Sequence, residues 1–292
     1  MQIQKSFKGQ SAYGKLYLVA TPIGNLEDMT FRAIQTLKEV NWIAAEDTRN
    51  TGLLLKHFDI PTKQISFHEH NAKEKIPDLI DLLKQGQNIA QVSDAGLPSI
   101  SDPGHDLVKA AIMEDIAVVT VPGASAGISA LIASGLTPQP HIFYGFLPRK
   151  SGQQKQFFEL KKDYPETQIF YESPHRVADT LENMIEVYGD RSVVLVRELT
   201  KIYEEYQRGR ISDLLESIAE TPLKGECLLI VEGASQEVED KDEEDLFAEI
   251  QARLQQGIKK NQAIKEVAKI YQWNKSQLYA AYHEWEENQS DD

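Results

Sequence analysis

The sequence predicts an α/β protein with two sheet-containing domains and a small helical appendage after them. Three observations support this fold class. Short β-rich runs alternate with amphipathic helical runs from Gly14 onward, a break rich in proline interrupts this alternation, and three helical patterns follow an acidic run. Strands that alternate with helices form a largely parallel sheet covered by helices on both faces, because each crossover between parallel strands contains a helix.

The first alternating block contains five strand candidates, at residues 15–23, 42–46, 64–68, 88–94 and 117–121. Asn25 is a suitable N-cap for a helix from Leu26, since Glu27 and Asp28 would lie in its first turn. Pro77 is expected near the start of a later helix that ends at Gly86. The block therefore predicts a domain with a parallel sheet.

A second, shorter α/β block follows the segment GLTPQP at residues 135–140, whose prolines and glycine suit an interdomain linker. Its strand candidates are residues 141–147, 168–173, 192–199 and 226–233, with helices from Ser151 and Pro174, and we expect a mixed sheet. The predicted organisation is an N-terminal extension (1–13), a first α/β domain (14–137), a second α/β domain (141–234), an acidic linker (235–246) and a three-helix appendage (247–292).

Composition narrows the class of protein. The chain has 292 residues, 41% of them hydrophobic, and a formal net charge of −14. Cys227 is the single cysteine, so no intrachain disulfide forms; we expect a buried thiol and a reducing, cytoplasmic location. No apolar run is long enough to cross a bilayer, and the N-terminus lacks the apolar part of a signal peptide. The negative net charge argues against binding of nucleic acid over the whole surface of the protein, so any RNA site must be local.

The most informative segment is Ser93–Gly104, SDAGLPSISDPG, which leaves a predicted strand and leads into a helix. Ligands of parallel sheets bind at the carboxyl ends of the strands. Gly96 and Gly104 allow close approach of the backbone, and Asp94 and Asp102 can accept hydrogen bonds from an amine or a ribose diol. The segment predicts a cofactor loop, although a turn-rich connector explains the same residues.

Three further segments end strands of the same predicted sheet: Val121–Gly127 (VPGASAG), Ala20–Leu26 (ATPIGNL) and Ala44–Arg49 (AAEDTR). The first opens a helix, whose free N–H groups can face a ligand. Close packing of strand and helix, or capped turns at Asp47 and Thr48, would explain each of them separately. Together, four such turns at one edge of a sheet favour a binding site.

In order and spacing, these segments resemble the ribosomal RNA small subunit methyltransferase I family, and YESPHR (171–176) and VRELTK (196–201) match that family too. The resemblance runs from about Tyr13 to Gly233. It implies the tetrapyrrole methylase fold, with two α/β domains, S-adenosylmethionine between them as co-substrate, and a homodimer. The implied activity is 2′-O-methylation of a cytidine in the decoding region of 16S rRNA, with small-subunit rRNA or the 30S subunit as partner and no membrane contact.

Carried over by position, the resemblance implies a donor site in both domains. Its residues are Asp94, Ala95, Gly96, Pro98, Ser101, Asp102, Ser125, Ala126, Leu147, Tyr171, Glu172 and Arg197.

Methyl transfer from a sulfonium requires alignment of the acceptor oxygen, and a ribose hydroxyl benefits from a nearby base. The candidates are Glu46, Asp47, Glu172 and His175, and no sequence argument selects one of them; His175 also reads as a cap at a helix start, and Asp47 as an N-cap. Arg49, Arg149, Lys150 and Arg176 are the RNA-binding candidates, since arginine holds phosphate with two hydrogen bonds.

Other basic and histidine residues have a structural explanation as well. A solvated helix face accounts for the lysines that follow Lys150, while Arg208 and Arg210 suggest a second basic loop. His68 and His70 would lie on one face of a strand, but no third ligand follows at a useful spacing, so no metal site is expected.

Two other functions remain open at this point. One is methylation of a small tetrapyrrole; here the first loop reads TPIGN and lacks the glycine-rich sequence typical of that branch. The other is a ribosome- or RNA-binding protein without catalytic activity. A generic nucleotide-binding domain is disfavoured, because the chain has neither a P-loop nor a GxGxxG motif.

Overall fold

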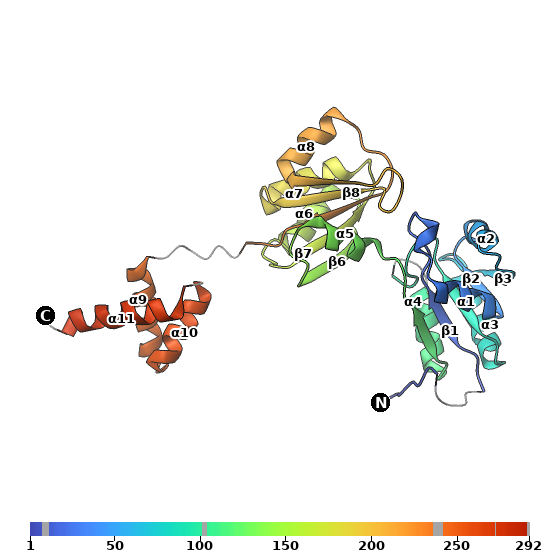
Figure 1. Cartoon of the computed structure of the whole chain (residues 1–292), viewed down its shortest axis with the longest axis horizontal. Coiled ribbons are helices and arrows are strands. Elements are labelled where there is room, and N and C mark those ends of the chain that lie inside the picture. Colours follow the sequence, from blue (N-terminus) through green and yellow to red (C-terminus); the bar gives the residue numbers. More distant parts are fainter. Residues whose placement is uncertain (8–11, 101–103, 236–241, 272, 291–292) are drawn as a thin grey trace. The chain divides into compact units, whose positions relative to one another are not determined.

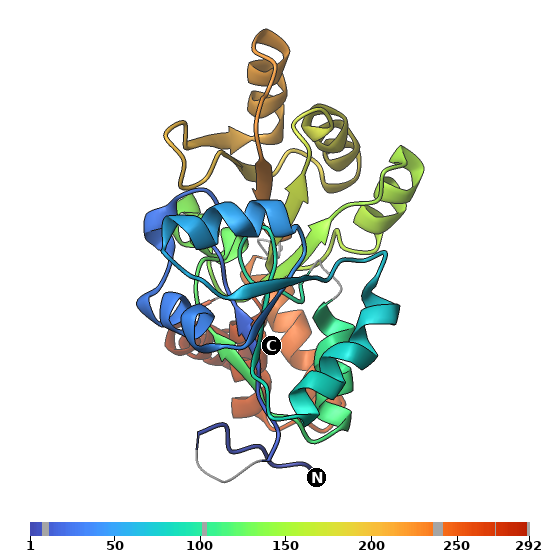
Figure 2. The same cartoon turned by 90° about the vertical axis from the view of Figure 1, so that its right-hand side faces the viewer.

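The structure, a computed structural model, describes residues 1–7, 12–100, 104–235, 242–271 and 273–290 (Figures 1 and 2). The chain divides into two compact units, Met1–Ala234 and Ser235–Asp292. The first unit contains two five-stranded sheets, and the described part of the second unit is helical. The functional site described below lies wholly within the first unit.

The first sheet is parallel throughout, as predicted. Its strands are β1 (Leu16–Val19), β2 (Trp42–Ala45), β3 (Lys63–Ser66), β4 (Ile89–Val92) and β5 (Val118–Val121), in the order β3-β2-β4-β1-β5. The connecting helices are α1 (Phe31–Glu39), α2 (Thr48–His57), α3 (Ala72–Lys84) and α4 (Gly104–Met113). From β1 the chain crosses toward β2, and from its neighbour β4 it crosses the other way toward β5. Such a switch point opens a crevice outside the carboxyl ends of the two strands.

The second sheet is mixed, also as predicted. Its strands are β6 (His141–Phe146), β7 (Thr167–Glu172), β8 (Ser192–Arg197), β9 (Glu205–Arg210) and β10 (Cys227–Val231), in the order β6-β7-β10-β8-β9. Only β6 and β7 pair in parallel within this sheet. The helices α6 (Ser151–Glu159), α7 (Val177–Tyr188) and α8 (Ile211–Glu220) belong to this half. Together the two sheets confirm the predicted α/β class.

Helix α5 (Ala126–Ser134) joins the two halves of the first unit. It begins just after β5 of the first sheet, yet Ala130 and Leu131 pack on Ile169, Val196 and other buried residues of the second sheet. The loop that precedes α5 is therefore held between the carboxyl edge of one sheet and a face of the other.

The predicted basic loop around Arg208 and Arg210 is wrong, because these residues belong to a strand. Arg208 and Arg210 lie on this strand, which pairs with β8 in antiparallel register. The Arg208 guanidinium donates to the carbonyl oxygens of Ser134 (3.0 Å) and Ala133 (2.8 Å). The sequence EYQRGR carries little apolar alternation, because β9 is an edge strand, and a polar edge strand gives no periodic signal.

Several predicted details of the first half are also corrected. Asn25 caps a short 3-10 helix, η1 (Leu26–Asp28), by accepting from the Glu27 amide at 3.0 Å, and α1 begins only after Thr30, whose hydroxyl accepts from the Ala33 amide. Pro77 lies in the second turn of α3, because this helix begins five residues earlier.

His68 and His70 are corrected as well. They lie in the turn between β3 and α3 and not on a strand, with their ring centroids 5.9 Å apart.

The second sheet buries an aromatic cluster against α6 and α7. The Phe170 side chain is fully buried, stacks on Tyr144 at 5.4 Å between centroids, and meets Phe157 and Phe158 edge to face. We expect Phe170→Ala to lower the free energy of unfolding by about 3–5 kcal/mol, since it removes a large buried ring and leaves a cavity. Urea denaturation measures this loss. Leu160→Ala, at an exposed position, is the control and should change stability by less than about 0.5 kcal/mol; an equal loss in both variants would contradict this packing.

The described part of the second unit contains α9 (Glu243–Gln255), α10 (Lys260–Ile270) and α11 (Lys275–Ser290) around a core that includes Phe247 and Tyr282. Helix α9 begins inside the segment 235–246 that the sequence predicts as a linker. The Asp242 side chain caps it by accepting from the Asp245 amide at 3.0 Å, and acidic residues in its first turn suit the positive end of the helix dipole. Residues 236–241 of that segment lie outside the described residues. None of the described helices has the length and apolar character needed to span a bilayer.

Candidate functional site

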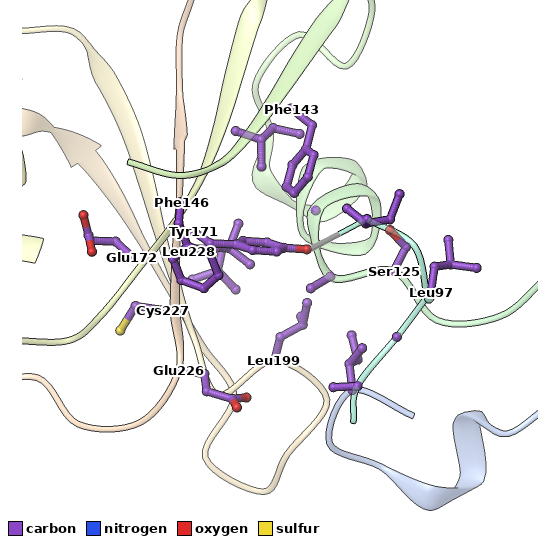
Figure 3. A pocket seen from close by; sticks show the side chains of 18 of the residues that line it. Leu97, Ser125, Phe143, Phe146, Tyr171, Glu172, Leu199, Glu226, Cys227 and Leu228 are labelled. Carbon is purple, nitrogen blue, oxygen red and sulfur yellow. The ribbon is translucent and has the colours of Figure 1, made fainter. Parts of the chain in front are cut away.

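A cavity of about 560 Å³ lies between the carboxyl edge of the first sheet and the second sheet (Figure 3). Its volume lies in the range typical of small-molecule sites. From the first half it is lined by Ile23, Glu46, Ser93, Ala95, Gly96, Leu97, Ile100, Ser125, Ala126, Gly127 and Ile128. From the second half it is lined by Phe143, Phe146, Ile169, Tyr171, Glu172, Ser173, Pro174, Val196, Leu199, Gly225, Glu226, Cys227 and Leu228.

The cavity sits at the switch point between β1 and β4. Thr21 and Gly96, in the loops that follow these strands, form an antiparallel bridge with N···O distances of 2.9 and 3.1 Å. Gly96 has φ +77°, and a Cβ there would approach Ile23 to 3.2 Å. At Gly123 a Cβ would come within 2.6 Å of the Ala20 Cβ, so the loops after β1 and β5 also require a glycine to pack. All four loops singled out in the sequence contribute residues to the cavity wall or to the packing beside it.

The predicted donor-binding residues divide into three groups. Six of them line the cavity: Ala95, Gly96, Ser125, Ala126, Tyr171 and Glu172. Four others belong to its surroundings: Asp94, Pro98, Leu147 and Arg197. Ser101 and Asp102 lie outside the described residues.

The surrounding residues have other partners in the structure. The Leu147 side chain is buried in the core with Phe170, and Arg197 holds the Glu205 carboxylate at 2.9 and 2.6 Å. The Asp94 carboxylate accepts from the Asp47 amide at 3.2 Å and from Asn50 at 3.3 Å, which ties the loop after β4 to α2. Pro98 is buried. Sequence reasoning places these residues at the site, but it does not determine which way each side chain points.

Phe143 and Phe146, which form an aromatic wall of the cavity with the predicted Tyr171, were not anticipated from the sequence. The Phe143 and Phe146 rings lie 4.9 and 5.5 Å from the Tyr171 ring, both edge to face. In a regular strand, residues three apart point to opposite faces. A β-bulge between Phe143 and Gly145 shifts the register, and this bulge brings both phenylalanines to the cavity. No pattern in the sequence marks it.

Tyr171 crosses the cavity toward the start of α5, as Figure 3 shows. Burial raises the pKa of its phenol, an effect that a hydrogen bond with the Gly127 backbone partly offsets. The neutral hydroxyl therefore sits beside the N-terminal turn of α5, where backbone N–H groups are free to face a ligand. Cys227, buried as expected, has its thiol pKa raised to about 11 by burial.

Among the four base candidates, Asp47 already has hydrogen-bond partners for its carboxylate. It is the N-cap of α2, and its carboxylate accepts from the Arg49 amide (2.8 Å) and from the Arg49 guanidinium (3.1 and 2.7 Å). These contacts, the side-chain bond with Arg49 foremost, lower the pKa of Asp47 to about 2. A carboxylate so stabilised in its charged form is a weak proton acceptor.

This lowered pKa gives a testable dependence of stability on pH. Since the pKa of Asp47 falls from 3.8 to about 2 in the folded protein, the ionised side chain stabilises the fold above pH 3.8 and loses that contribution as the pH falls toward 2. Asp47→Asn keeps a capping side chain and removes only the charge. We expect the melting temperatures of wild type and variant to differ most near neutral pH and to converge on acidification. A difference that is constant with pH would contradict the ion pair.

The other three candidates lie in different surroundings. Glu46 lines the cavity, and its carboxylate accepts from the Asp94 amide at 3.3 Å. His175 is exposed in the turn before α7, two residues ahead of the helix start at Val177. Glu172 is 2% exposed, and in Figure 3 its carboxylate points away from the side of the strand occupied by the Tyr171 ring.

The four RNA-binding candidates differ in exposure and in the partners of their side chains. Arg49 is largely exposed and holds Asp47, whereas Arg176 donates to the Pro148 carbonyl at 2.8 Å and lies 3.4 Å from Glu172. Arg149 and Lys150 are exposed in the turn before α6. Among the residues that the structure describes, no group of three His, Cys, Asp or Glu side chains is arranged to hold a metal ion.

Comparison with known proteins gives consistent matches. The family model for tetrapyrrole (corrin/porphyrin) methylases matches residues 15–215. The ribosomal RNA small subunit methyltransferase I of Streptococcus pyogenes serotype M1 is 71% identical over 286 residues, which cover 97% of this chain and all of that protein. The protein of the same name from Bacillus subtilis (strain 168) is 50% identical over 96% of this chain and 98% of its own length.

Solved structures share the fold at low sequence identity. Diphthine synthase aligns with a TM-score of 0.59 and 13% identity over 75% of this chain and 90% of its own. Uroporphyrin-III C-methyltransferase from Thermus thermophilus, solved with S-adenyl homocysteine, aligns with a TM-score of 0.52 and 19% identity over 75% and 97%.

Proposed function

Because this chain belongs to the ribosomal RNA small subunit methyltransferase I family, which has the tetrapyrrole methylase fold, we propose that it is an S-adenosylmethionine-dependent methyltransferase that methylates a cytidine in the decoding region of 16S rRNA on its ribose 2′-hydroxyl. The proposal includes a cytoplasmic location and a homodimer. The observation that carries it is the cavity at the switch point of the parallel sheet.

The cavity suits the methyl donor in size and chemistry. Aromatic and aliphatic side chains such as Phe143, Tyr171 and Leu228 give an apolar surface for an adenosine group. The Thermus thermophilus uroporphyrin-III C-methyltransferase, which shares this fold, was solved with S-adenyl homocysteine, and this supports a ligand of the S-adenosylmethionine class here.

When bound, S-adenosylmethionine supplies an already activated methyl group, so the protein's main task is to position the acceptor. We assign the base to Glu46: it lines the cavity, while Asp47 is held by Arg49 and Glu172 points to the other side of its strand. In this assignment the Glu46 carboxylate would accept the proton of the ribose hydroxyl as the oxygen bonds to the methyl carbon and the methyl–sulfur bond breaks, with S-adenosylhomocysteine as the leaving group. The Asp94 amide, 3.3 Å away, orients that carboxylate.

The RNA is proposed to meet a local basic surface near the cavity. Arg149 and Lys150 are exposed, and only two residues separate them from Phe146, which lines the cavity. Two adjacent cations suit a phosphate backbone, and a small patch is compatible with the net charge of −14.

A transfer assay tests the proposed function. The purified chain is incubated with methyl-labelled S-adenosylmethionine and, separately, with small ribosomal subunits, naked small-subunit rRNA or a tetrapyrrole precursor. We expect label only in the ribosomal samples, on a ribose. Label confined to the tetrapyrrole would contradict the substrate. Absence of donor binding by calorimetry, with and without subunits, would leave only a non-catalytic ribosome-binding protein.

A further inference from the structure

Glu172 belongs to a buried polar network on the α7 side of the second sheet. Along β7, Phe170 packs in the core with α6 and α7, whereas Ile169 and Tyr171 lie on the face toward α5. Since alternate residues of a strand share a face, Glu172 is on the same side as Phe170. Its carboxylate is fully buried there and accepts from the Ser173 amide at 2.8 Å and from the Thr180 hydroxyl at 2.9 Å.

The network forms a closed circuit around one backbone carbonyl. The Gln154 amide donates to the Thr180 hydroxyl (3.2 Å) and to the Pro148 carbonyl (3.0 Å). The Arg176 guanidinium donates to the same carbonyl (2.8 Å) and lies 3.4 Å from Glu172, which closes the circuit. Thr180 and Gln154 are 0% and 3% exposed, so the bonds that the Thr180 hydroxyl makes with Glu172 and Gln154 lie away from water.

Further bonds fix the start of α6 to the same network. The Asn183 side chain donates to Gln154 at 2.9 Å and accepts from the Ser151 hydroxyl at 2.7 Å. Two residues of α7, Thr180 and Asn183, and the first turn of α6 are thereby joined to the end of β7. Losing one member leaves buried partners unsatisfied, which is costly.

The held segment connects the cavity to the exposed cations. Pro148 lies two residues after Phe146, whose ring lines the cavity, and immediately before Arg149 and Lys150. Nothing in this circuit needs the carboxylate to exchange protons with a ligand.

We propose that Glu172, Thr180, Gln154 and Arg176 act as positioning residues that hold the Pro148 segment, so that Arg149 and Lys150 present a fixed phosphate-binding site to the RNA. This inference rests on the proposed function for the identity of the RNA. It gives Glu172 and Arg176 structural roles in substrate alignment instead of proton transfer and direct phosphate contact.

The variant Thr180→Val tests the proposal, because it keeps the shape of the side chain and removes the hydroxyl that links Glu172 to Gln154. We expect the KM for small subunits to rise about tenfold, while kcat, the pH profile and the Kd for S-adenosylmethionine stay within about twofold. Backbone amides of residues 149–154 should exchange hydrogen faster. Thr180→Ser should restore the wild-type KM.

Thr167→Val is the matched control. Thr167 is equally buried, and its hydroxyl donates only to the Thr137 carbonyl at 2.6 Å, at the opposite end of β7. We expect it to leave the KM and the exchange of residues 149–154 unchanged. An unchanged KM and unchanged exchange in Thr180→Val would overturn the proposal, as would a fall in kcat with an altered pH profile, which would make Glu172 a base. An inactive wild-type enzyme contradicts the proposed function alone, since hydrogen exchange still tests the circuit.

Discussion

Replacing Ser125 with tryptophan is expected to weaken the binding of S-adenosylmethionine by about a hundredfold or more, which corresponds to roughly 2.7 kcal/mol. Ser125 lines the cavity at the start of α5, across from Tyr171 (Figure 3). An indole at this position would fill space that the donor needs. The wild-type Ser125 side chain makes no capping hydrogen bond, so the substitution removes no capping bond from α5. Calorimetry with the donor measures the effect.

The control at this position is Ser125→Ala. Because the hydroxyl caps nothing, we expect the alanine variant to keep its melting temperature and to bind the donor within about threefold of wild type. If the tryptophan variant binds as tightly as wild type, the donor does not occupy this cavity. A parallel loss in the alanine variant would instead show that the hydroxyl itself contacts the donor.

Glu46→Gln is expected to lower kcat by about 10²- to 10³-fold with little change in the Kd for the donor. Glutamine keeps the shape of the side chain and can still accept from the Asp94 amide, but it cannot take a proton. The measurement is single-turnover methylation of small subunits at saturating donor, which separates chemistry from product release.

Glu226→Gln is the comparison for the Glu46 variant. Glu226 also lines the cavity, but its carboxylate is paired with Lys201 at 2.9 Å and is 78% exposed. We expect its kcat to stay within about threefold of wild type. Equal losses in the two variants would show a general effect of charge in the cavity, and an unchanged kcat in Glu46→Gln would remove Glu46 from the mechanism.

Much of the first half of the fold follows from local sequence signals. Strands β1, β2, β4 and β5 are mainly apolar runs between helices with clear periodicity, and such runs predict a parallel sheet. The four loops after these strands must meet at one edge, because parallel strands share their carboxyl ends. That topological argument predicts a ligand site at the loops that contain Gly96, Ser125 and Ala126, and the family resemblance assigns these residues to it.

The wall formed by the second sheet could not be predicted in the same way. The bulge that turns Phe143 and Phe146 to one side depends on pairing with β7, which is a tertiary interaction. The direction of Glu172 depends on the register of that strand. Gln154, which is linked to Glu172 through the Thr180 hydroxyl, is 18 residues distant in sequence and carries no motif. Resemblance to a family selects the segment, but only the geometry distinguishes a side chain at the ligand from one that supports it.

The most direct test of the central claim is a map of ribose methylation on small-subunit rRNA from cells with and without the gene for this chain. The proposed function predicts one 2′-O-methylated cytidine in the decoding region that is lost with the gene and restored by the wild-type chain, but not by Ser125→Trp. An unchanged methylation map, or a lost methyl group on a base instead of a ribose, would contradict it.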